Sequence, residues 1–256
     1  MKRPSIQKKQ SGRVNLIFIA SFISLIGLWM LATTLKWVDP LFLPSLGEIG
    51  HRALFLSNEG GFFGDIAISV GRVMLAFTIS ALIAVPLAAF MSEFRWLNRL
   101  IEPYIDFIRY LPVPALIPLS ILIFGIGEEA KIALLFTGTF FQLILLILDD
   151  LKQIPSTYLD LAYTLKYGRG KLLHLKLASI APQIYNNCRI TLGWCWTYLV
   201  IAELVASQAG IGHMIKEAQR FSNTADVFVG IMVMGIIGFA SDNILKFFYP
   251  RIFKYQ

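Results

Sequence analysis

Four ionisable residues stand inside stretches of the chain that are otherwise apolar enough to cross a membrane. They are Arg72, Arg109, Arg189 and Glu203. A charged side chain at the centre of a membrane helix costs about 2.5–3.5 kcal/mol on insertion scales, so such residues usually face a protein interior or a water-filled path. Three cations around a shared interior would suit an anionic solute. All four residues are therefore candidates for lining a translocation path.

The same four residues also have structural interpretations. Arg72 lies near the start of its apolar stretch, where a long side chain can extend to the membrane interface. Arg189 can pair with a lipid phosphate. It cannot reach Glu203 directly, because fourteen helical residues span about 21 Å. We expect Glu203 to bond instead to the polar segment outside the membrane that follows it.

No arrangement of residues typical of an enzyme is present. His51, His174 and His213 fall in different loops, and no Walker-type phosphate-binding loop occurs. Cys188 and Cys195 are seven residues apart on one face of an apolar stretch, where we expect them to pack rather than to form a disulfide or bind a metal. The sequence predicts no catalytic residues, no metal site and no cofactor held by this chain.

The composition is that of an integral membrane protein. Of the 256 residues, 56% are hydrophobic and 15% charged, and the mean hydropathy is +0.66, whereas soluble domains carry about 25% charged residues. The alternating pattern of a membrane β-barrel is absent, which leaves a polytopic all-α fold. The net charge of +7 is attributed to cytoplasmic loops rather than to nucleic-acid binding.

Hydropathy predicts about six membrane crossings. Their expected ranges are 14–35, 66–91, 103–124, 130–148, 183–206 and 227–248. The first run could also be a signal peptide, but it is longer than a typical hydrophobic region and no A-x-A cleavage site follows. The remaining segments are a tail at 1–13, an outer loop with a short helix at 36–65, a transport core at 66–248 and a tail at 249–256.

The basic residues indicate the orientation. With the N-terminus in the cytoplasm, the inner segments hold fifteen Lys and Arg and the outer segments hold five. This bias matches the positive-inside rule and places both termini in the cytoplasm. The segment 92–102 is expected to be a short charged turn on the inner side.

The third crossing is unusually rich in proline and is followed by glycines. These helix-break or gate candidates are Pro112, Pro114, Pro118, Gly125 and Gly127. Prolines at this density break or kink a helix. At membrane depth, a break persists only where it is buried in protein or lines a cavity.

A polar, basic segment at 151–182 lies between the fourth and fifth crossings on the inner side. It predicts a short helix at about 156–170 that begins at Pro155-Ser156-Thr157 and is ended by Gly168 and Gly170. Such a helix can dock into a groove on a soluble partner. Alternatively, it lies on lipid headgroups.

This segment resembles the "EAA" cytoplasmic loop of bacterial ABC-importer permeases, which forms the coupling helix. The matching positions, and thus the candidate ATPase-coupling residues, are Asp160, Leu161, Ala162, Thr164, Leu165, Gly168 and Gly170. Asp160 replaces the usual Glu, Leu161 replaces Ala, and Lys166 stands where Gly is usual.

Other stretches resemble the nitrate/sulfonate/taurine/bicarbonate branch of the same family. They are 109–119 (RYLPVPALIPL) with 124–128 (FGIGE), 202–204 (AEL) with 210–212 (GIG), and 69–73 (SVGRV). The resemblance extends over about residues 60–250. It implies a MetI-like type I permease core in the bacterial inner membrane.

The resemblance also implies partners. Two permeases, here expected to be identical copies, would surround the path, and a cytoplasmic ABC ATPase dimer using ATP and magnesium would bind the coupling helices. A periplasmic or lipid-anchored binding protein would deliver a small anionic solute. The alternatives are an aromatic or vitamin-precursor cargo, or a membrane channel or scaffold that needs no motor.

Overall fold

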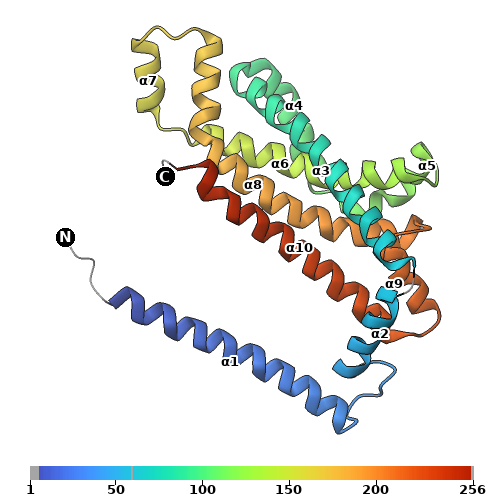
Figure 1. Cartoon of the computed structure of the whole chain (residues 1–256). Coiled ribbons are helices and arrows are strands. Elements are labelled where there is room, and N and C mark those ends of the chain that lie inside the picture. The colour runs from blue at the N-terminus through green and yellow to red at the C-terminus, as the bar shows by residue number, and fades with distance from the viewer. Residues whose placement is uncertain (1–5, 59, 255–256) are drawn as a thin grey trace.

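The computed structural model describes residues 6–58 and 60–254, with side chains from residue 19 onward except that of residue 206. Every regular element in this part of the chain is a helix (Figure 1). The elements are α1 (Ile6–Thr34), α2 (Leu46–Asn58), α3 (Phe62–Glu93), α4 (Arg95–Ile108), η1 (Val113–Leu116), α5 (Ile117–Phe124), α6 (Glu128–Lys152), α7 (Ser156–Thr164), α8 (Arg169–Ala206), α9 (Ile211–Arg220) and α10 (Thr224–Ile252).

Four helices, α3, α6, α8 and α10, are long and apolar enough to span a membrane. The pair formed by α4 and η1–α5 also passes as one span, but it is bent by 96° at its break. The expected first crossing falls within α1, whose described apolar part is the shorter stretch Ile19–Thr34. The all-α polytopic fold is therefore confirmed.

The third crossing is broken where the prolines predict a break. Pro112 stands before η1 with an extended backbone (φ −63°, ψ 117°). Pro114 and Pro118 occupy the first turns of η1 and α5, where a missing backbone N–H costs nothing to the helix. The four residues between α4 and η1 thus turn the chain sharply.

The expected charged turn at 92–102 is wrong. Helix α3 runs to Glu93 and α4 starts at Arg95, so the turn is confined to Phe94. Apolar side chains recur at helical spacing within this stretch, and those of Leu97, Ile101 and Ile105 pack into the core beside α6. Their burial stabilises a helix that hydropathy alone does not reveal.

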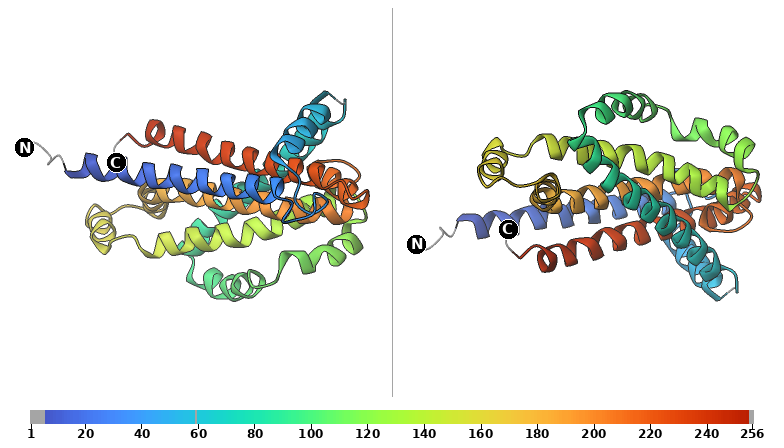
Figure 2. Two further views of the ribbon diagram at one scale, coloured as in Figure 1. Left: turned by 90° about the horizontal axis from the view of Figure 1, so that it is seen from below. Right: turned by 90° about the horizontal axis from the view of Figure 1, so that it is seen from above.

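The core is formed by α6 lying between α3 and α8 (Figures 1 and 2). Small residues let these helices approach closely. Ala76, Ala84 and Ala88 of α3 are fully buried. A Cβ added to Gly138 of α6 would lie 2.6 Å from the ring of Tyr198 of α8, so this contact requires glycine.

Helix α1 stands apart from the bundle along most of its length in Figure 1. Its described contacts are at its C-terminal end, where Trp29 donates a hydrogen bond to the carbonyl oxygen of Pro44 (3.1 Å) and meets the ring of Phe228 edge-on. The beginning of α1, the end of α10 and α7 lie at the same end of the molecule (Figures 1 and 2). Helices α2 and α9 lie at the opposite end.

The helix expected at 156–170 is shorter than predicted. Helix α7 ends at Thr164, and Lys166 adopts a left-handed conformation (φ +53°). The backbone N–H of Lys166 bonds to Tyr163, and that of Tyr167 bonds to Ala162, the paired closure usually completed by glycine. Gly168 and Gly170 do not end α7. Gly168 precedes α8 and Gly170 lies in its first turn.

Candidate functional site

Arg72 of α3 is the centre of an ionic cluster at the end of the bundle opposite α7. Its side chain is only 4% exposed. Its Nε and Nη2 atoms donate to both carboxylate oxygens of Glu128 at 2.6 Å. Nη1 donates to Glu203 (2.6 Å) and to the carbonyl oxygen of Ala209 (2.8 Å). The guanidinium is therefore held by groups from α6, from α8 and from the loop before α9.

Glu203 of α8 is fully buried, and both of its carboxylate oxygens accept hydrogen bonds. Besides Arg72, it accepts hydrogen bonds from the Ser69 hydroxyl (2.8 and 2.9 Å) and from the backbone N–H of Gly212 (2.8 Å). The expected bond from Glu203 to the polar segment that follows it is thus confirmed. Buried charges persist only when they are paired and hydrogen-bonded in this way.

Two glycines allow the loop before α9 to close over this cluster. Gly210 has φ +111°, and a Cβ there would lie 2.5 Å from Glu203 Oε1. At Gly212 a Cβ would lie 2.4 Å from the Cβ of Glu203. Asp65 at the start of α3 accepts the Gly210 N–H (2.7 Å). These contacts support a structural role for Arg72 and Glu203, and a path-lining role for either residue stays a prediction.

Arg109 lies beside a cavity of about 370 Å³ at the break of the third span. Its guanidinium stacks 4.5 Å from the ring centroid of Tyr110 and donates to the Tyr110 hydroxyl (2.9 Å). Its Nε atom is 3.4 Å from Asp106 but is buried without a hydrogen-bond partner in the described structure. Part of its donor capacity is therefore unused.

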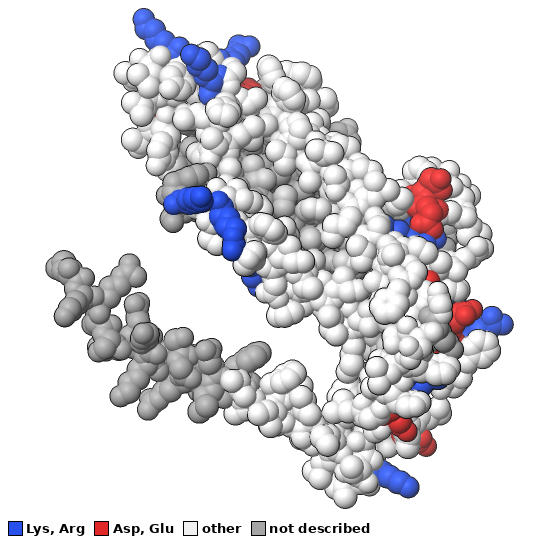
Figure 3. Space-filling view, viewed as in Figure 1, with Lys and Arg blue, Asp and Glu red and all other residues white. Residues whose placement is uncertain are grey.

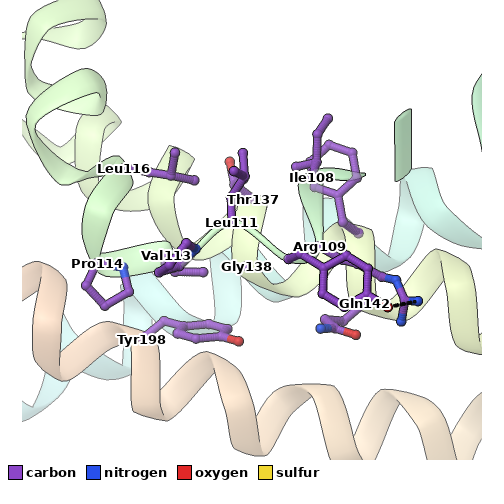
Figure 4. Close-up of a pocket in the computed structure, with 13 residues that line it drawn as sticks. Ile108, Arg109, Leu111, Val113, Pro114, Leu116, Thr137, Gly138, Gln142 and Tyr198 are labelled. Carbon is purple, nitrogen blue, oxygen red and sulfur yellow. Dashed lines mark hydrogen bonds between the residues drawn. The ribbon is translucent and has the colours of Figure 1, made fainter. Parts of the chain in front are cut away.

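Polar groups from two other helices face the same cavity. Figure 4 shows Gln142 of α6 next to Arg109. It also shows Tyr198 of α8, whose hydroxyl points towards Gln142. Thr137 adds a further hydroxyl to the lining. An arginine, an amide and hydroxyls around one cavity can bind a small anion by charge and hydrogen bonds.

Arg189 is engaged differently from the other two arginines. Its Nε pairs with Asp242 of α10 (2.8 Å), which also pairs with Lys246 (2.5 Å). Asp242 was not singled out by the sequence analysis, although an acid inside the sixth apolar stretch is a visible signal. Arg189 therefore joins α8 to α10, and its path-lining role also stays a prediction.

The glycines that follow the third span adopt special positions. Gly125 ends α5 with φ +79°, a conformation that favours glycine. Gly127 precedes α6, and a Cβ there would lie 2.7 Å from the carboxylate of Glu129. These placements explain the turn. A gating role for either glycine, or for the prolines of the break, stays a prediction.

Helix α7 presents apolar side chains to its surroundings. Leu161 and Leu165 are 57% and 56% exposed, and Asp160 and Thr164 are exposed as well, whereas Ala162 is buried. An exposed apolar surface on a short helix outside the spans is typical of an interaction site. Among the described residues, no group of three or more His, Cys, Asp or Glu side chains is arranged to hold a metal ion.

The apolar helices, one broken span among them, define a polytopic helical membrane protein. The family of binding-protein-dependent transport system inner membrane components matches residues 76–254, which is more than half of the chain. The chain belongs to this family.

Relatives extend the match to most of the chain. The taurine transport system permease of Escherichia coli is 31% identical over 91% of this chain and 87% of its own length. A putative aliphatic sulfonates permease of Bacillus subtilis is 28% identical over 100% and 91%, respectively. The bicarbonate transport system permease of Synechococcus elongatus is 26% identical over 98% and 95%.

Solved structures share the fold. An amino acid ABC transporter has a TM-score of 0.59 at 16% identity, covering 74% of this chain and 93% of that one. An inward-facing form of the MetNI methionine ABC transporter has a TM-score of 0.58 at 18% identity, covering 72% and 94%. This protein is thus the membrane permease component of an ABC importer, in a family that works with an ATPase and a binding protein.

Proposed function

We propose that this permease imports a small anion of the sulfonate, taurine, nitrate or bicarbonate type, and that Arg109 contacts the anion on its way through the membrane. The cavity at the broken third span carries this proposal. Of the three arginines in apolar stretches, Arg72 and Arg189 are held by carboxylates within 3 Å, whereas the closest carboxylate of Arg109 is 3.4 Å away. The named cargoes of three relatives support an anionic solute.

Uptake by the reconstituted transporter tests the role of Arg109. The permease is placed in liposomes with its ATPase and its binding protein, and ATP-dependent uptake of labelled taurine, sulfonate, nitrate and bicarbonate is measured. Arg109→Gln should lower uptake of the transported anion by about tenfold or more, because a hydrogen bond to a charged group contributes about 1.5–3 kcal/mol. Arg109→Lys keeps the positive charge but loses the forked guanidinium group, so its uptake rate should lie between those of the wild type and Arg109→Gln.

The matched control is Arg251→Gln. Arg251 is an exposed arginine near the end of α10, away from the cavity and from the end of the bundle proposed to meet the binding protein, and its replacement should leave uptake unchanged. If Arg109→Gln transports the anion as fast as the wild type in an intact complex, Arg109 does not contact the cargo.

The partners of this permease are inferred from its family and from the exposed surface of α7. Two identical copies of the chain would enclose the path, with both termini in the cytoplasm, and α7 of each copy would bind one subunit of an ATPase dimer that uses ATP and magnesium. The exposed apolar side chains of α7 support this contact. A periplasmic or lipid-anchored binding protein would deliver the solute at the opposite end of the bundle.

One observation favours a second cargo class. Aromatic side chains of Tyr110, Phe141 and Tyr198 also line the cavity, and they would suit an aromatic or vitamin-precursor solute. ATP hydrolysis by the complex with its binding protein distinguishes the two cargo classes, because only the true ligand of the binding protein should stimulate it. Uptake without ATP would instead identify a channel that needs no motor.

A further inference from the structure

A second cavity lies at the α7 end of the bundle, away from the cavity beside Arg109. Its volume is about 320 Å³, and it lies where the ends of α3 and α6 meet α4, α7 and α8. Four basic side chains line it, those of Arg95, Arg99, Lys152 and Lys176. No step of the proposed transport path uses this cavity.

Two of the four cations are neutralised within the protein. Lys176 pairs with Glu93 (2.5 Å), and Lys152 pairs with Glu102 (2.6 Å) and lies 3.8 Å from Asp149. These are the carboxylates that pair with the basic side chains of the cavity in the described part of the chain.

Arg95 and Arg99 are the uncompensated cations of this cavity. Neither takes part in an ion pair or a hydrogen bond of its side chain among the described residues, and both are exposed. They are four residues apart and therefore lie on one face of α4. Guanidinium forks that line one cavity can bind the oxygen atoms of a phosphate group bidentately.

The beginning of α4 adds to this match. Arg95 is the first residue of the helix, and Phe94 before it provides no side-chain cap. The first backbone N–H groups of α4 therefore have no side-chain acceptor at the cap position. Unsatisfied N–H groups at the start of a helix favour a bound anion.

A neighbouring face of α4 is apolar and exposed. Trp96, Leu100, Tyr104 and Phe107 are each more than half exposed and recur at helical spacing. A helix that combines a basic face with an exposed aromatic and aliphatic face is typical of the membrane interface, where the first meets headgroups and the second meets acyl chains.

We propose that the cavity between α4 and α7 binds the phosphate group of an anionic ligand, with Arg95 and Arg99 as its principal contacts, and that the apolar face of α4 makes an anionic phospholipid its best-fitting source. Leu159 of α7 lines the same cavity. A bound headgroup would therefore contact the helix that we propose to bind the ATPase. The proposal requires only that the bundle spans a membrane and not that the cargo is an anion.

Native mass spectrometry of the purified complex tests the site. The complex is exposed to mixed micelles of phosphatidylcholine alone or with phosphatidylglycerol, and retained lipid is counted. Guanidinium groups that line a site donate charge-assisted hydrogen bonds to a bound phosphate, which exposed cations elsewhere on the surface do not. The Arg95→Ala/Arg99→Ala variant should therefore bind phosphatidylglycerol about tenfold or more weakly than the wild type.

The control removes equal charge at the same end of the molecule. Arg169→Ala/Lys171→Ala changes two exposed residues of α8 that do not line the cavity, and it should retain phosphatidylglycerol like the wild type. If the alanine pair does not fold, Arg95→Lys/Arg99→Lys keeps the charge, loses the forks and should still bind more weakly.

A thermal-stability titration with millimolar inorganic phosphate, against chloride at equal ionic strength, separates the two sources of phosphate. Stabilisation of the wild type but not of the alanine pair by phosphate, with no preference for phosphatidylglycerol, supports the site and assigns it to the free ion. Equal phosphatidylglycerol retention by the wild type, the alanine pair and the lysine pair, with no effect of phosphate on stability, overturns the proposal.

Discussion

At the scale of single residues, the arginines in the apolar stretches differ in what already occupies their guanidinium groups. Arg72 donates hydrogen bonds from its guanidinium group to Glu128, Glu203 and a backbone carbonyl oxygen. Arg109 shares its group with a neighbouring tyrosine and keeps a buried Nε without a hydrogen bond. Both residues are arginines within apolar stretches of the sequence, so only their three-dimensional partners distinguish a packing residue from a candidate for binding an anion.

The Arg72 cluster leads to a stability prediction. Glu203→Leu leaves part of a buried guanidinium unpaired and should lower the free energy of unfolding by about 3–5 kcal/mol. Thermal unfolding of the detergent-solubilised protein measures the loss. Glu217→Leu, at an exposed acid of α9, is the control and should change little. Similar midpoints for the two variants would show that the cluster does not stabilise the fold.

The left-handed residue after α7 leads to a second prediction. Lys166 has φ +53°, a conformation that costs an ordinary residue about 1–2 kcal/mol but that glycine adopts freely. Lys166→Gly should therefore strengthen the closure of α7 by about 1 kcal/mol. Hydrogen exchange at the Tyr167 amide, which bonds to Ala162, should become about fivefold slower.

The control for this prediction changes the same residue type within a helix. Lys216→Gly lies inside α9, where glycine should destabilise the helix by about 1 kcal/mol. Faster exchange at the Tyr167 amide in Lys166→Gly would contradict the assigned role of Lys166.

At the scale of the helices, hydropathy and proline content predict most of the architecture. The sequence predicts α3, α6, α8 and α10 because each contains one long apolar run. In a membrane, such a run satisfies its backbone polar groups by forming a helix. The break in the third span is recognised because Pro112 and its neighbours cannot continue a helix. The start of α4 is missed, since its charged residues mask the apolar spacing of Leu97, Ile101 and Ile105.

Contacts between distant segments are what the sequence does not reveal. Arg72 meets Glu128 across 56 residues, and Arg189 meets Asp242 from another helix. Gln142 and Tyr198 reach the Arg109 cavity because α6 and α8 pack together at Gly138. Each of these contacts depends on the register between helices, which no local pattern in one helix specifies.

Helix α7 leads to a prediction about the motor. Leu161 and Leu165 are more than half exposed, so Leu161→Asp/Leu165→Asp should leave the fold intact. If α7 docks into the ATPase, burying two carboxylates at the contact should weaken co-purification of the ATPase by about tenfold or more. Transport should fall in parallel.

The control for α7 places the same substitution at the other end of the molecule. Leu54 of α2 is 69% exposed, and Leu54→Asp should leave ATPase binding unchanged. Normal ATPase binding and uptake by the double α7 variant would exclude α7 as the coupling element.

At the scale of the whole molecule, charge is distributed unevenly along the bundle. On the face in Figure 3, Lys and Arg gather at the end that carries α7 and the end of α10, whereas most of the Asp and Glu lie towards α2 and α5. The same end holds the start of α1 (Figure 1). Basic residues near the ends of membrane helices are retained on the cytoplasmic side, which predicts that α7 and both termini face the cytoplasm.

Cysteine labelling in intact cells tests this orientation. Asn58→Cys at the end of α2 and Tyr163→Cys on α7 each introduce an exposed thiol at opposite ends of the molecule. The native Cys188 and Cys195 are both free and are replaced by alanine to remove background. A membrane-impermeant maleimide that has crossed the outer membrane should label residue 58 in intact cells and residue 163 only after the inner membrane is opened. The opposite pattern would place α7 outside the cell, where no ATP-driven motor could reach it, and would overturn both the orientation and the coupling role of this helix.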